Sequence, residues 1–371
     1  MIGPFPFTLF PNPAAGTPGP DVLPEAGAAR ARAVIAAWPD YAPTPLRDLA
    51  EIAAATHVAR VALKDEAGRF GLGSFKALGG AYAVAELLAA QPPGTDPARL
   101  TVTCATDGNH GRAVAWGARR FGCRCVIFVH ATVSQGRVDA IAAHGAEVRR
   151  VPGTYDDAVR EAARVAAAEG WHVVSDTSWE GYTDVPRAIM QGYRVMAAEA
   201  LEQFGPAPSH VFIQGGVGGV AAAVSAELRA RLDPAPFLVV VEPDKAACLL
   251  ASAELGAPTA VPGDLDTLMA GLACGEPSLL AWQELAHHAD AFMAVPDEAA
   301  IACMRLLAAR GIVAGESGVA GLAGFLLAAA DPAARATLGL GPASRVLLFS
   351  TEGATDPALY ARLVSPHPPP G

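Results

Sequence analysis

The sequence has 371 residues, of which 52% are hydrophobic, so it is long enough to bury a large core and to form about two domains. Its formal charge of −10 at pH 7 disfavours a nucleic-acid partner or an anionic membrane surface, and leaves a small cationic or zwitterionic substrate compatible. The sequence contains neither a signal-peptide pattern nor an apolar run of about 18 residues, which disfavours secretion and membrane spanning.

The predicted elements alternate along most of the chain. The first forty or so residues are rich in Pro, Gly and Ala without sustained periodicity, which predicts an extended arm over residues 1–43. Strands are expected at 58–64, 100–105, 124–129, 173–175, 210–214, 237–242 and 345–350. Helices are expected at 75–88, 110–121, 135–144, 156–168, 185–203, 219–231, 297–309 and 319–329. This alternation predicts an α/β protein with mostly parallel sheets flanked by helices.

We expect two domains. The larger would consist of residues 1–79 and 192–371, including the arm, and the smaller of residues 80–191. In open parallel sheets, ligands bind where a strand ends and a helix begins. Four such junctions carry unusual residues.

The first junction holds a lysine after a glycine-rich turn, in the run Gly71-Leu72-Gly73-Ser74-Phe75-Lys76. A cation in the first turn of a helix opposes the helix dipole, so Lys76 is a poor choice for stability alone. A solvated lysine is the structural alternative, but the glycine-rich setting favours an engaged amine. A desolvated lysine can lose its proton and attack a carbonyl carbon, which begins Schiff-base chemistry.

The second junction follows the strand at 100–105 and reads Thr106-Asp107-Gly108-Asn109-His110-Gly111. Its backbone N–H groups are expected to face the space above the strand end and to bind an anion there. Asp107 is unusual, because a carboxylate repels a substrate carboxylate unless a second positive charge compensates. A substrate with a second ammonium group would supply that charge, and Asp107 could also remove a proton. The alternative is a helix cap in which Asp107 or Asn109 only satisfies backbone donors.

The third junction is the run Gln214-Gly215-Gly216-Val217-Gly218-Gly219-Val220, between a predicted strand and helix. Free N–H groups in such a loop can cradle a phosphate. The spacing fits neither the dinucleotide fingerprint nor the P-loop. A tight structural turn is the alternative interpretation.

The fourth junction is Ser350-Thr351-Glu352-Gly353, directly after an apolar strand. A hydroxyl that donates to a pyridine nitrogen would leave that ring uncharged, which favours β-elimination over transamination. Capping of a turn by the hydroxyl is the alternative. Two further runs are ambiguous: Asp176-Thr177-Ser178-Trp179-Glu180-Gly181-Tyr182 could line a substrate mouth or form a surface turn, and Glu316-Ser317-Gly318 could be a plain N-cap.

The six cysteines are too few for a disulfide scaffold, and Cys123 and Cys125 are too close for ordinary zinc ligands. We therefore expect a reducing cytoplasm and no metal site. Cys248 and Cys274 are interpreted as packed thiols, with a redox pair as the alternative.

Taken with these junctions, the chain resembles the fold-type II pyridoxal-phosphate enzymes, the group of the threonine and serine dehydratases and the tryptophan synthase β-subunit, from about residue 44 to 356. Within that group it is most similar to the diaminopropionate ammonia-lyases. The similarity lies in Gly73-Ser74-Phe75-Lys76-Ala77-Leu78-Gly79-Gly80, Thr106-Asp107-Gly108-Asn109-His110-Gly111-Arg112 and Asp176-Thr177-Ser178-Trp179-Glu180-Gly181-Tyr182. Supporting matches are Met190-Gln191-Gly192-Tyr193, residues 269–278 and Ser350-Thr351-Glu352-Gly353.

The resemblance implies a tryptophan synthase β-like fold of two twisted sheets with pyridoxal 5'-phosphate as cofactor. It implies that Lys76 forms the internal aldimine, that Asn109 contacts the phenolic oxygen and that Thr351 meets the pyridine nitrogen. The phosphate is expected on Gly215, Gly216, Val217, Gly218 and Gly219. The substrate is expected on Thr106, Asp107, Gly108, His110 and Asp176.

The implied reaction, in amino-acid catabolism, converts D- or L-2,3-diaminopropionate to pyruvate and two ammonia. Lys76 would be the base on one face of the substrate and Asp107 on the other. A homodimer is also expected from the resemblance. Two alternatives remain open: a serine or threonine dehydratase on the same scaffold, for which relatives usually carry a small residue in place of Asp107, and a catalytically silent cofactor-binding regulatory protein.

Overall fold

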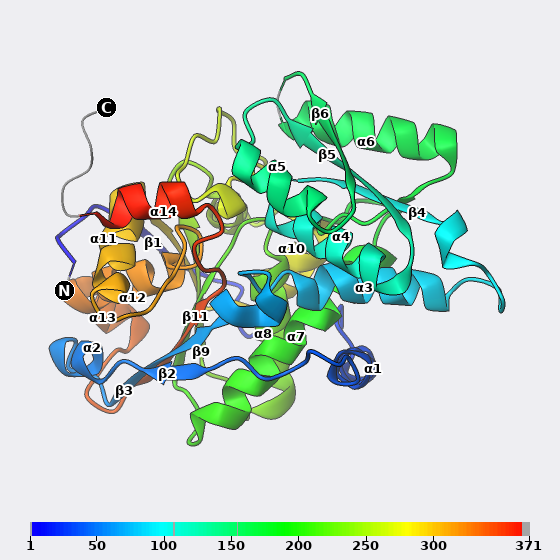
Figure 1. Cartoon of the computed structure of the whole chain (residues 1–371). Coiled ribbons are helices and arrows are strands. Elements are labelled where there is room, and N and C mark those ends of the chain that lie inside the picture. Colours follow the sequence, from blue (N-terminus) through cyan, green and yellow to red (C-terminus); the bar gives the residue numbers. More distant parts are fainter. Residues whose placement is uncertain (1, 107, 154, 366–371) are drawn as a thin grey trace.

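The computed structural model describes residues 2–106, 108–153 and 155–365, which form two β-sheets with helices packed on them (Figure 1). The larger sheet has seven strands in the order β1-β10-β9-β8-β11-β3-β2, and the smaller has four in the order β6-β5-β4-β7. The strands of the larger sheet are β1 (Thr8–Pro11), β2 (Leu46–Asp48), β3 (Arg60–Asp65), β8 (His210–Gln214), β9 (Phe237–Pro243), β10 (Ala291–Val295) and β11 (Arg345–Ser350). Those of the smaller are β4 (Thr101–Ala105), β5 (Arg124–His130), β6 (Glu147–Val151) and β7 (His172–Val173).

Most strand pairs are parallel, as the sequence predicts. All pairs in the smaller sheet are parallel, and so are those among β3, β11, β8, β9 and β10. Only the edge strands β1 and β2 of the larger sheet run antiparallel to their neighbours. The continuous burial of β8, β10 and most of β9 and β11 explains their unbroken apolar sequences, because a central parallel strand has no solvent face.

Helices cover both faces of the larger sheet, and those of the smaller sheet form the upper right lobe of Figure 1. The α-helices are α1 (Glu25–Ala36), α2 (Ala50–Ala55), α3 (Ala77–Ala89), α4 (Asn109–Phe121), α5 (Gln135–Ala142), α6 (Tyr155–Glu169), α7 (Asp184–Phe204), α8 (Gly219–Arg231), α9 (Cys248–Leu255), α10 (Leu279–His288), α11 (Asp297–Ala308), α12 (Ala320–Ala330), α13 (Pro332–Leu338) and α14 (Pro357–Val364), and the 3₁₀ turns are η1 (Glu66–Gly71), η2 (Pro97–Arg99) and η3 (Ala270–Leu272). None of the described helices is both long and apolar enough to cross a membrane.

Alternate side chains of the central strands point into two separate cores. Val211 and Ile213 of β8 belong to the core that α3, α7 and α8 complete. Phe212 between them belongs to the opposite core, where its ring centroid lies 5.5 Å from that of Phe325 of α12. The period of two along each strand therefore divides the apolar side chains between two layers of helices.

Helix α3 is held against α7 and α4 at positions where only glycine fits. A Cβ atom on Gly192 of α7 would lie 2.0 Å from the carbonyl oxygen of Leu78, and one on Gly117 of α4 would lie 2.7 Å from the Cα of Ala81. Packed interiors do not tolerate such approaches, so the backbones themselves make the contact. This close packing fixes the start of α3, which directly follows Lys76.

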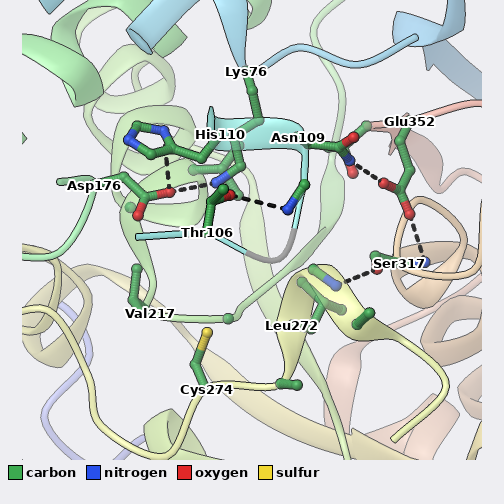
Figure 2. Close-up of a pocket in the computed structure, with 18 of the residues that line it drawn as sticks. Lys76, Thr106, Asn109, His110, Asp176, Val217, Leu272, Cys274, Ser317 and Glu352 are labelled. Atoms are coloured by element: carbon green, nitrogen blue, oxygen red, sulfur yellow. Dashed lines mark hydrogen bonds and ion pairs between the residues drawn. The ribbon is translucent and has the colours of Figure 1, made fainter. Parts of the chain in front are cut away.

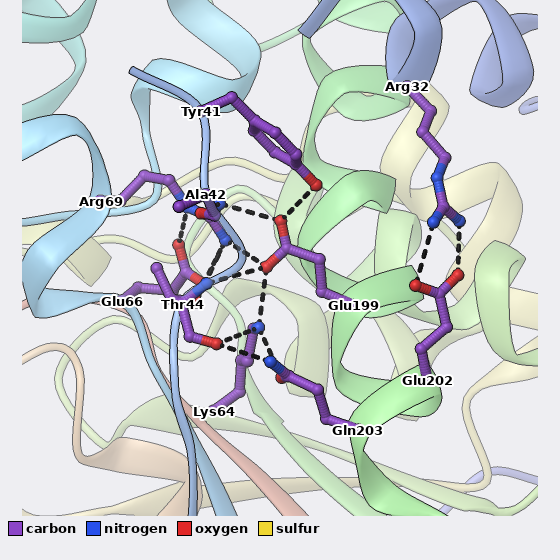
Figure 3. Close-up of polar contacts among 10 residues, drawn as sticks. All are labelled: Arg32, Tyr41, Ala42, Thr44, Lys64, Glu66, Arg69, Glu199, Glu202 and Gln203. Atoms are coloured by element: carbon purple, nitrogen blue, oxygen red, sulfur yellow. Dashed lines mark hydrogen bonds and ion pairs between the residues drawn. The ribbon is translucent and has the colours of Figure 1, made fainter. Parts of the chain in front are cut away.

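A buried ion cluster fixes the chain just before that lysine (Figure 3). Glu199 of α7 accepts hydrogen bonds from Arg69 and lies 2.7 Å from the Lys64 ammonium of β3. Arg69 also donates to Glu66, at 2.8 Å. Two cations and two carboxylates thus balance where their side chains are at most 2% exposed. Because η1 leads straight into the turn of Lys76, the cluster anchors the beginning of that turn.

The N-terminal arm is not extended throughout, and the prediction for it is wrong in part. Residues 8–11 form β1 against β10, and residues 25–36 form helix α1 packed on α7. Ala28, Ala31 and Ile35 recur at helical spacing and are buried, but the surrounding Pro and Gly obscured this period.

The domain boundaries stay a prediction. The four strands of the smaller sheet all lie within residues 80–191, and those of the larger sheet lie outside it. Both expected boundaries fall inside helices, residue 80 in α3 and residue 191 in α7.

Candidate active site

A pocket lies at the carboxyl ends of β4, β8 and β11, where the four junctions converge (Figure 2). This is where ligands bind in open parallel sheets. Its lining includes Lys76, Thr106, Gly108, Asn109, His110, Asp176, Gly215, Gly216, Val217, Gly219 and Thr351. Of the remaining predicted residues, Gly218 does not line the pocket, and Asp107 lies outside the described residues.

Lys76 is placed by the turn that precedes α3. Gly71 and Gly73 adopt positive φ angles of 70° and 72°, which glycine tolerates without strain. The Phe75 N–H donates to the Thr351 carbonyl at 3.1 Å, which attaches the turn to the end of β11. Lys76 itself is the N-cap of α3 and lies just outside the helix rather than in its predicted first turn.

The Lys76 ammonium forms an ion pair with Asp176, at 2.6 Å. Burial lowers the pKa of Lys76, but the Asp176 carboxylate more than offsets this, so the pKa lies above its ordinary value. Burial raises the pKa of Asp176, but His110 and Lys76 outweigh it and hold that pKa below its usual range. The carboxylate beside the Lys76 amine therefore stabilises the charged form of that amine in this structure, against the effect of desolvation.

His110 lies beside the same carboxylate. Its Nε2 is 2.7 Å from the Val174 carbonyl, and because a carbonyl only accepts, Nε2 carries the hydrogen. Its Nδ1 faces Asp176 at 3.7 Å and has no hydrogen-bond partner in the described part of the chain. Burial lowers the pKa of His110, against an opposing effect of Asp176.

Thr106, rather than Asn109, caps the turn before α4. Its Oγ1 accepts hydrogen bonds from the N–H groups of Gly108 and Gly111, at 3.0 and 3.1 Å. Two of the donors expected to bind an anion are therefore already used. The hydroxyl of a threonine two residues before an N–H group is an ordinary sequence signal for such a turn, and it was overlooked.

The Asn109 side chain is held by Arg112 on its own helix and by Glu352, which follows strand β11. Its Oδ1 accepts from Arg112 at 3.0 Å, and its Nδ2 donates to the Glu352 carboxylate (Figure 2). Glu352 also accepts from the Ser317 N–H at 3.0 Å, and Ser317 Oγ accepts from the Gly271 N–H at 3.0 Å. These bonds fix the orientation of the Asn109 amide at the edge of the pocket.

The prediction for residues 316–318 is corrected by these contacts. Helix α12 begins at Ala320 after an N-cap without a side-chain bond, so Ser317 is not its cap. Glu316 instead forms an ion pair with Arg137 of α5, at 3.1 Å. Burial raises the pKa of Glu316 to about 7. No pattern in the sequence indicates the ion pair of Arg137 and Glu316, because the two residues lie far apart in the chain.

The glycine loop, which precedes α8, forms part of the pocket wall. The Gly215 N–H donates to the Val241 carbonyl at 2.8 Å, and Gly216 and Gly218 have φ angles of 64° and 95°. A Cβ atom on Gly215 would lie 2.6 Å from Cγ of Glu242. The loop therefore requires glycine both for its turns and for its packing, and it brings the N-terminus of α8 to the pocket.

Glu242 lies buried beneath this loop and was not predicted. Its carboxylate accepts from two N–H groups in the first turn of α9, those of Leu249 and Leu250, at 2.9 and 2.8 Å. Burial raises its pKa to about 8, although the two backbone donors oppose the shift. The thiol of Cys248 is also buried next to the loop, and Cys274 lines the pocket.

Thr351 and Gln214 complete the site. Both are buried, and the Gln214 Nε2 donates to Thr351 Oγ1 at 2.6 Å. Thr351 lies at the end of β11 as expected, whereas Gln214 was considered only as the residue that precedes the glycine loop.

Comparison with known proteins gives the class first. A family model described as pyridoxal-phosphate-dependent enzyme matches residues 37–351. The chain therefore belongs to the pyridoxal-phosphate-dependent enzymes, and its fold is the fold type II that the sequence predicts.

More similar proteins then define the family within this class. The diaminopropionate ammonia-lyase of Escherichia coli K12 is 42% identical over 349 residues, which cover 87% of either chain. A crystal structure of the Escherichia coli enzyme with an aminoacrylate–PLP azomethine reaction intermediate matches with a TM-score of 0.90, at 38% identity over 97% of both chains. A biosynthetic L-threonine dehydratase of Salmonella typhimurium is 32% identical over 65% of this chain and 44% of its own. The chain is a member of the diaminopropionate ammonia-lyase family.

Proposed function

We propose that this protein eliminates ammonia from 2,3-diaminopropionate, in either enantiomeric form, with pyridoxal 5'-phosphate as cofactor. One substrate and one water would give pyruvate and two ammonia. Membership of the family supports this proposal. The observation that carries it is the partly buried ion pair of Lys76 and Asp176, which lies in the same pocket as the glycine loop.

The residues of the pocket fit the cofactor. The chain has three lysines, and only Lys76 lines the pocket. Lys64 belongs to the buried ion cluster, and Lys245 is paired with Asp297 at the surface. An aldehyde cofactor bound at Lys76 would withdraw electrons from the substrate Cα and acidify its proton.

Three groups would hold the other ends of the cofactor. The loop formed by residues 215–219, together with the N-terminus of α8, would bind the phosphate, since backbone N–H groups and the helix dipole both favour an anion. The N–H groups of Gly215 and Gly218 already donate to backbone carbonyls, so other N–H groups of the loop would make these contacts. The Asn109 amide, fixed by Arg112 and Glu352, would contact the phenolic oxygen. The Thr351 hydroxyl would donate to the pyridine nitrogen.

The Asp176 carboxylate would favour a diamino acid as the substrate. Asp176 holds an ammonium group in this structure, that of Lys76. A diamino acid brings a second ammonium of the same chemistry, and serine and threonine do not. Thr106, Gly108 and His110 line the pocket near the start of α4, where the substrate carboxylate is proposed to bind. Lys76 would move the Cα proton on one face and Asp107 on the other.

A dehydratase is the second candidate, favoured by the sequence similarity to threonine dehydratases, and one variant separates the two. Asp176→Asn should lower kcat/KM for diaminopropionate roughly 10- to 100-fold, the value of one hydrogen bond to a charged group, and should affect serine turnover less. Asp21→Asn, at an exposed position outside the pocket lining, is the control.

Pyruvate is measured from D-diaminopropionate, L-diaminopropionate and serine for each protein. Loss that is equal for all substrates would mean that Asp176 does not recognise the second amine. No pyruvate from either enantiomer, by wild-type protein loaded with the cofactor, would refute the proposed activity. A cytoplasmic location and a homodimer stay predictions; size-exclusion chromatography with light scattering tests the latter.

A further inference from the structure

The side chain of Gln214 is buried at the end of β8, next to the hydroxyl proposed to meet the cofactor ring. It is 1% exposed, and Thr351 is 4% exposed. Its Nε2 lies 2.6 Å from Thr351 Oγ1, 3.1 Å from the Phe349 carbonyl and 3.2 Å from the Gly318 carbonyl. Its Oε1 has no hydrogen-bond partner in the ranges that the structure describes.

These neighbours determine which way the amide points. Both backbone carbonyls can only accept hydrogen bonds, so the amide end that faces them must be the NH₂ group. An NH₂ group only donates. At the Gln214–Thr351 contact, the hydroxyl oxygen must therefore be the acceptor, and its own proton remains available for another partner.

We propose that Gln214 is a positioning residue that sets the direction of the hydrogen bond between Thr351 and the pyridine nitrogen of the cofactor. With its oxygen engaged by Gln214, the Thr351 hydroxyl directs its proton at the ring nitrogen. A nitrogen that accepts this hydrogen bond carries no proton of its own, so the ring stays uncharged. An uncharged ring is the weaker electron sink, and it favours loss of the β-amine over transamination.

This inference rests on the proposed cofactor site and goes beyond it. The substitution that tests it is Gln214→Met, which keeps the length of the side chain and removes the donor. The two carbonyls then lose their amide partner and compete for the hydroxyl proton, because buried carbonyls are seldom left unsatisfied. The lone pair of Thr351 becomes free to accept from a protonated ring nitrogen.

The readout is the ¹⁵N NMR signal of the ring nitrogen in protein reconstituted with ¹⁵N-labelled pyridoxal 5'-phosphate. Wild-type protein should show an unprotonated pyridine nitrogen at neutral pH. Gln214→Met should raise the pKa of that nitrogen by about one unit, the tenfold effect of one ordinary hydrogen bond. It should also increase the share of turnovers that end in pyridoxamine phosphate.

Two controls isolate the effect. Gln191→Met removes another buried amide, on α7, which donates to the Pro24 carbonyl, and should leave the ring signal unchanged. In a Thr351→Val background, Gln214→Met should add no further shift, because the two residues act through one contact.

The outcomes separate this inference from the proposed function. A pyridinium signal in wild-type protein at neutral pH, or an unchanged pKa of the ring nitrogen when the signal of Gln214→Met is titrated with pH, would overturn the inference while leaving the cofactor site intact. Failure of the cofactor to bind would refute both. A pyridinium signal in the wild-type protein overturns the inference even if the variant does not fold.

Discussion

Replacing Glu199 by Gln should destabilise the protein far more than replacing Glu202, three residues further along the same helix. Both carboxylates bind an arginine, but their settings differ (Figure 3). The side chain of Glu199 is 2% exposed and that of Glu202 is 44% exposed. Glutamine at position 199 would leave Lys64 and Arg69 with one carboxylate between them, that of Glu66.

The magnitude follows from the burial of these charges. Breaking a buried pair by removing one partner costs roughly 3–5 kcal/mol, whereas an exposed pair contributes about 0–1 kcal/mol. Unfolding entropy of about 2 cal/mol/K per residue gives roughly 0.8 kcal/mol/K for this chain. Glu199→Gln should therefore lower Tm by about 5 °C, and Glu202→Gln by about 1 °C or less.

Thermal unfolding of the two variants and the wild type, recorded at one pH and salt concentration, measures this difference. Urea titration of the same proteins gives the free energies independently. Equal shifts for the two variants would refute the reasoning, because it attributes the effect to burial and not to the loss of an ion pair. Added salt should reduce the small decrease in Tm caused by Glu202→Gln and leave the decrease caused by Glu199→Gln nearly unchanged.

Two further predictions concern the packing around the site. Gly192→Ala should destabilise the protein by about 1–3 kcal/mol and impair cofactor binding, because the new Cβ would collide with the Leu78 carbonyl and displace α3. The control is Gly136→Ala in α5, where a Cβ meets no atom within 4 Å. In thermal unfolding this control should be neutral or slightly stabilising. The raised pKa of Glu242, about 8, means that the folded state binds its proton more tightly than the unfolded state, so stability should fall as pH rises from 4.5 towards 8. Glu242→Gln should weaken this pH dependence in denaturation measured at pH 5 and pH 8, and an undiminished dependence would assign it to other groups.

The sequence predicted the parallel framework and the place of the site because both depend on local patterns. Strands β8 and β11 and helix α8 have the predicted bounds, since each is a run of one period closed by a clear turn. Two strands were missed for different reasons. Strand β6 has exposed and half-buried residues only, so it carries no apolar pattern. Strand β10 is a buried apolar run of five residues, which the sequence could have indicated.

The position of the site was predicted where one junction supplies it, as at Lys76 and Thr351, which both line the pocket. The chemical roles of these residues stay predictions. The site was missed where function needs partners from distant segments. Glu352 is part of the motif Ser350-Thr351-Glu352-Gly353, but only the folded structure shows that its carboxylate accepts a hydrogen bond from Asn109. Similarly, the charge of Lys76 could not be predicted without Asp176, which lies one hundred residues later in the chain.

Reductive labelling tests the central claim most directly. The protein is loaded with pyridoxal 5'-phosphate, treated with borohydride, digested and mapped by mass spectrometry. Since the chain has only three lysines, every possible attachment site is distinguished. The account predicts a stable adduct on the peptide that contains Lys76. An adduct confined to Lys64 or Lys245, or no adduct on any lysine, would contradict it.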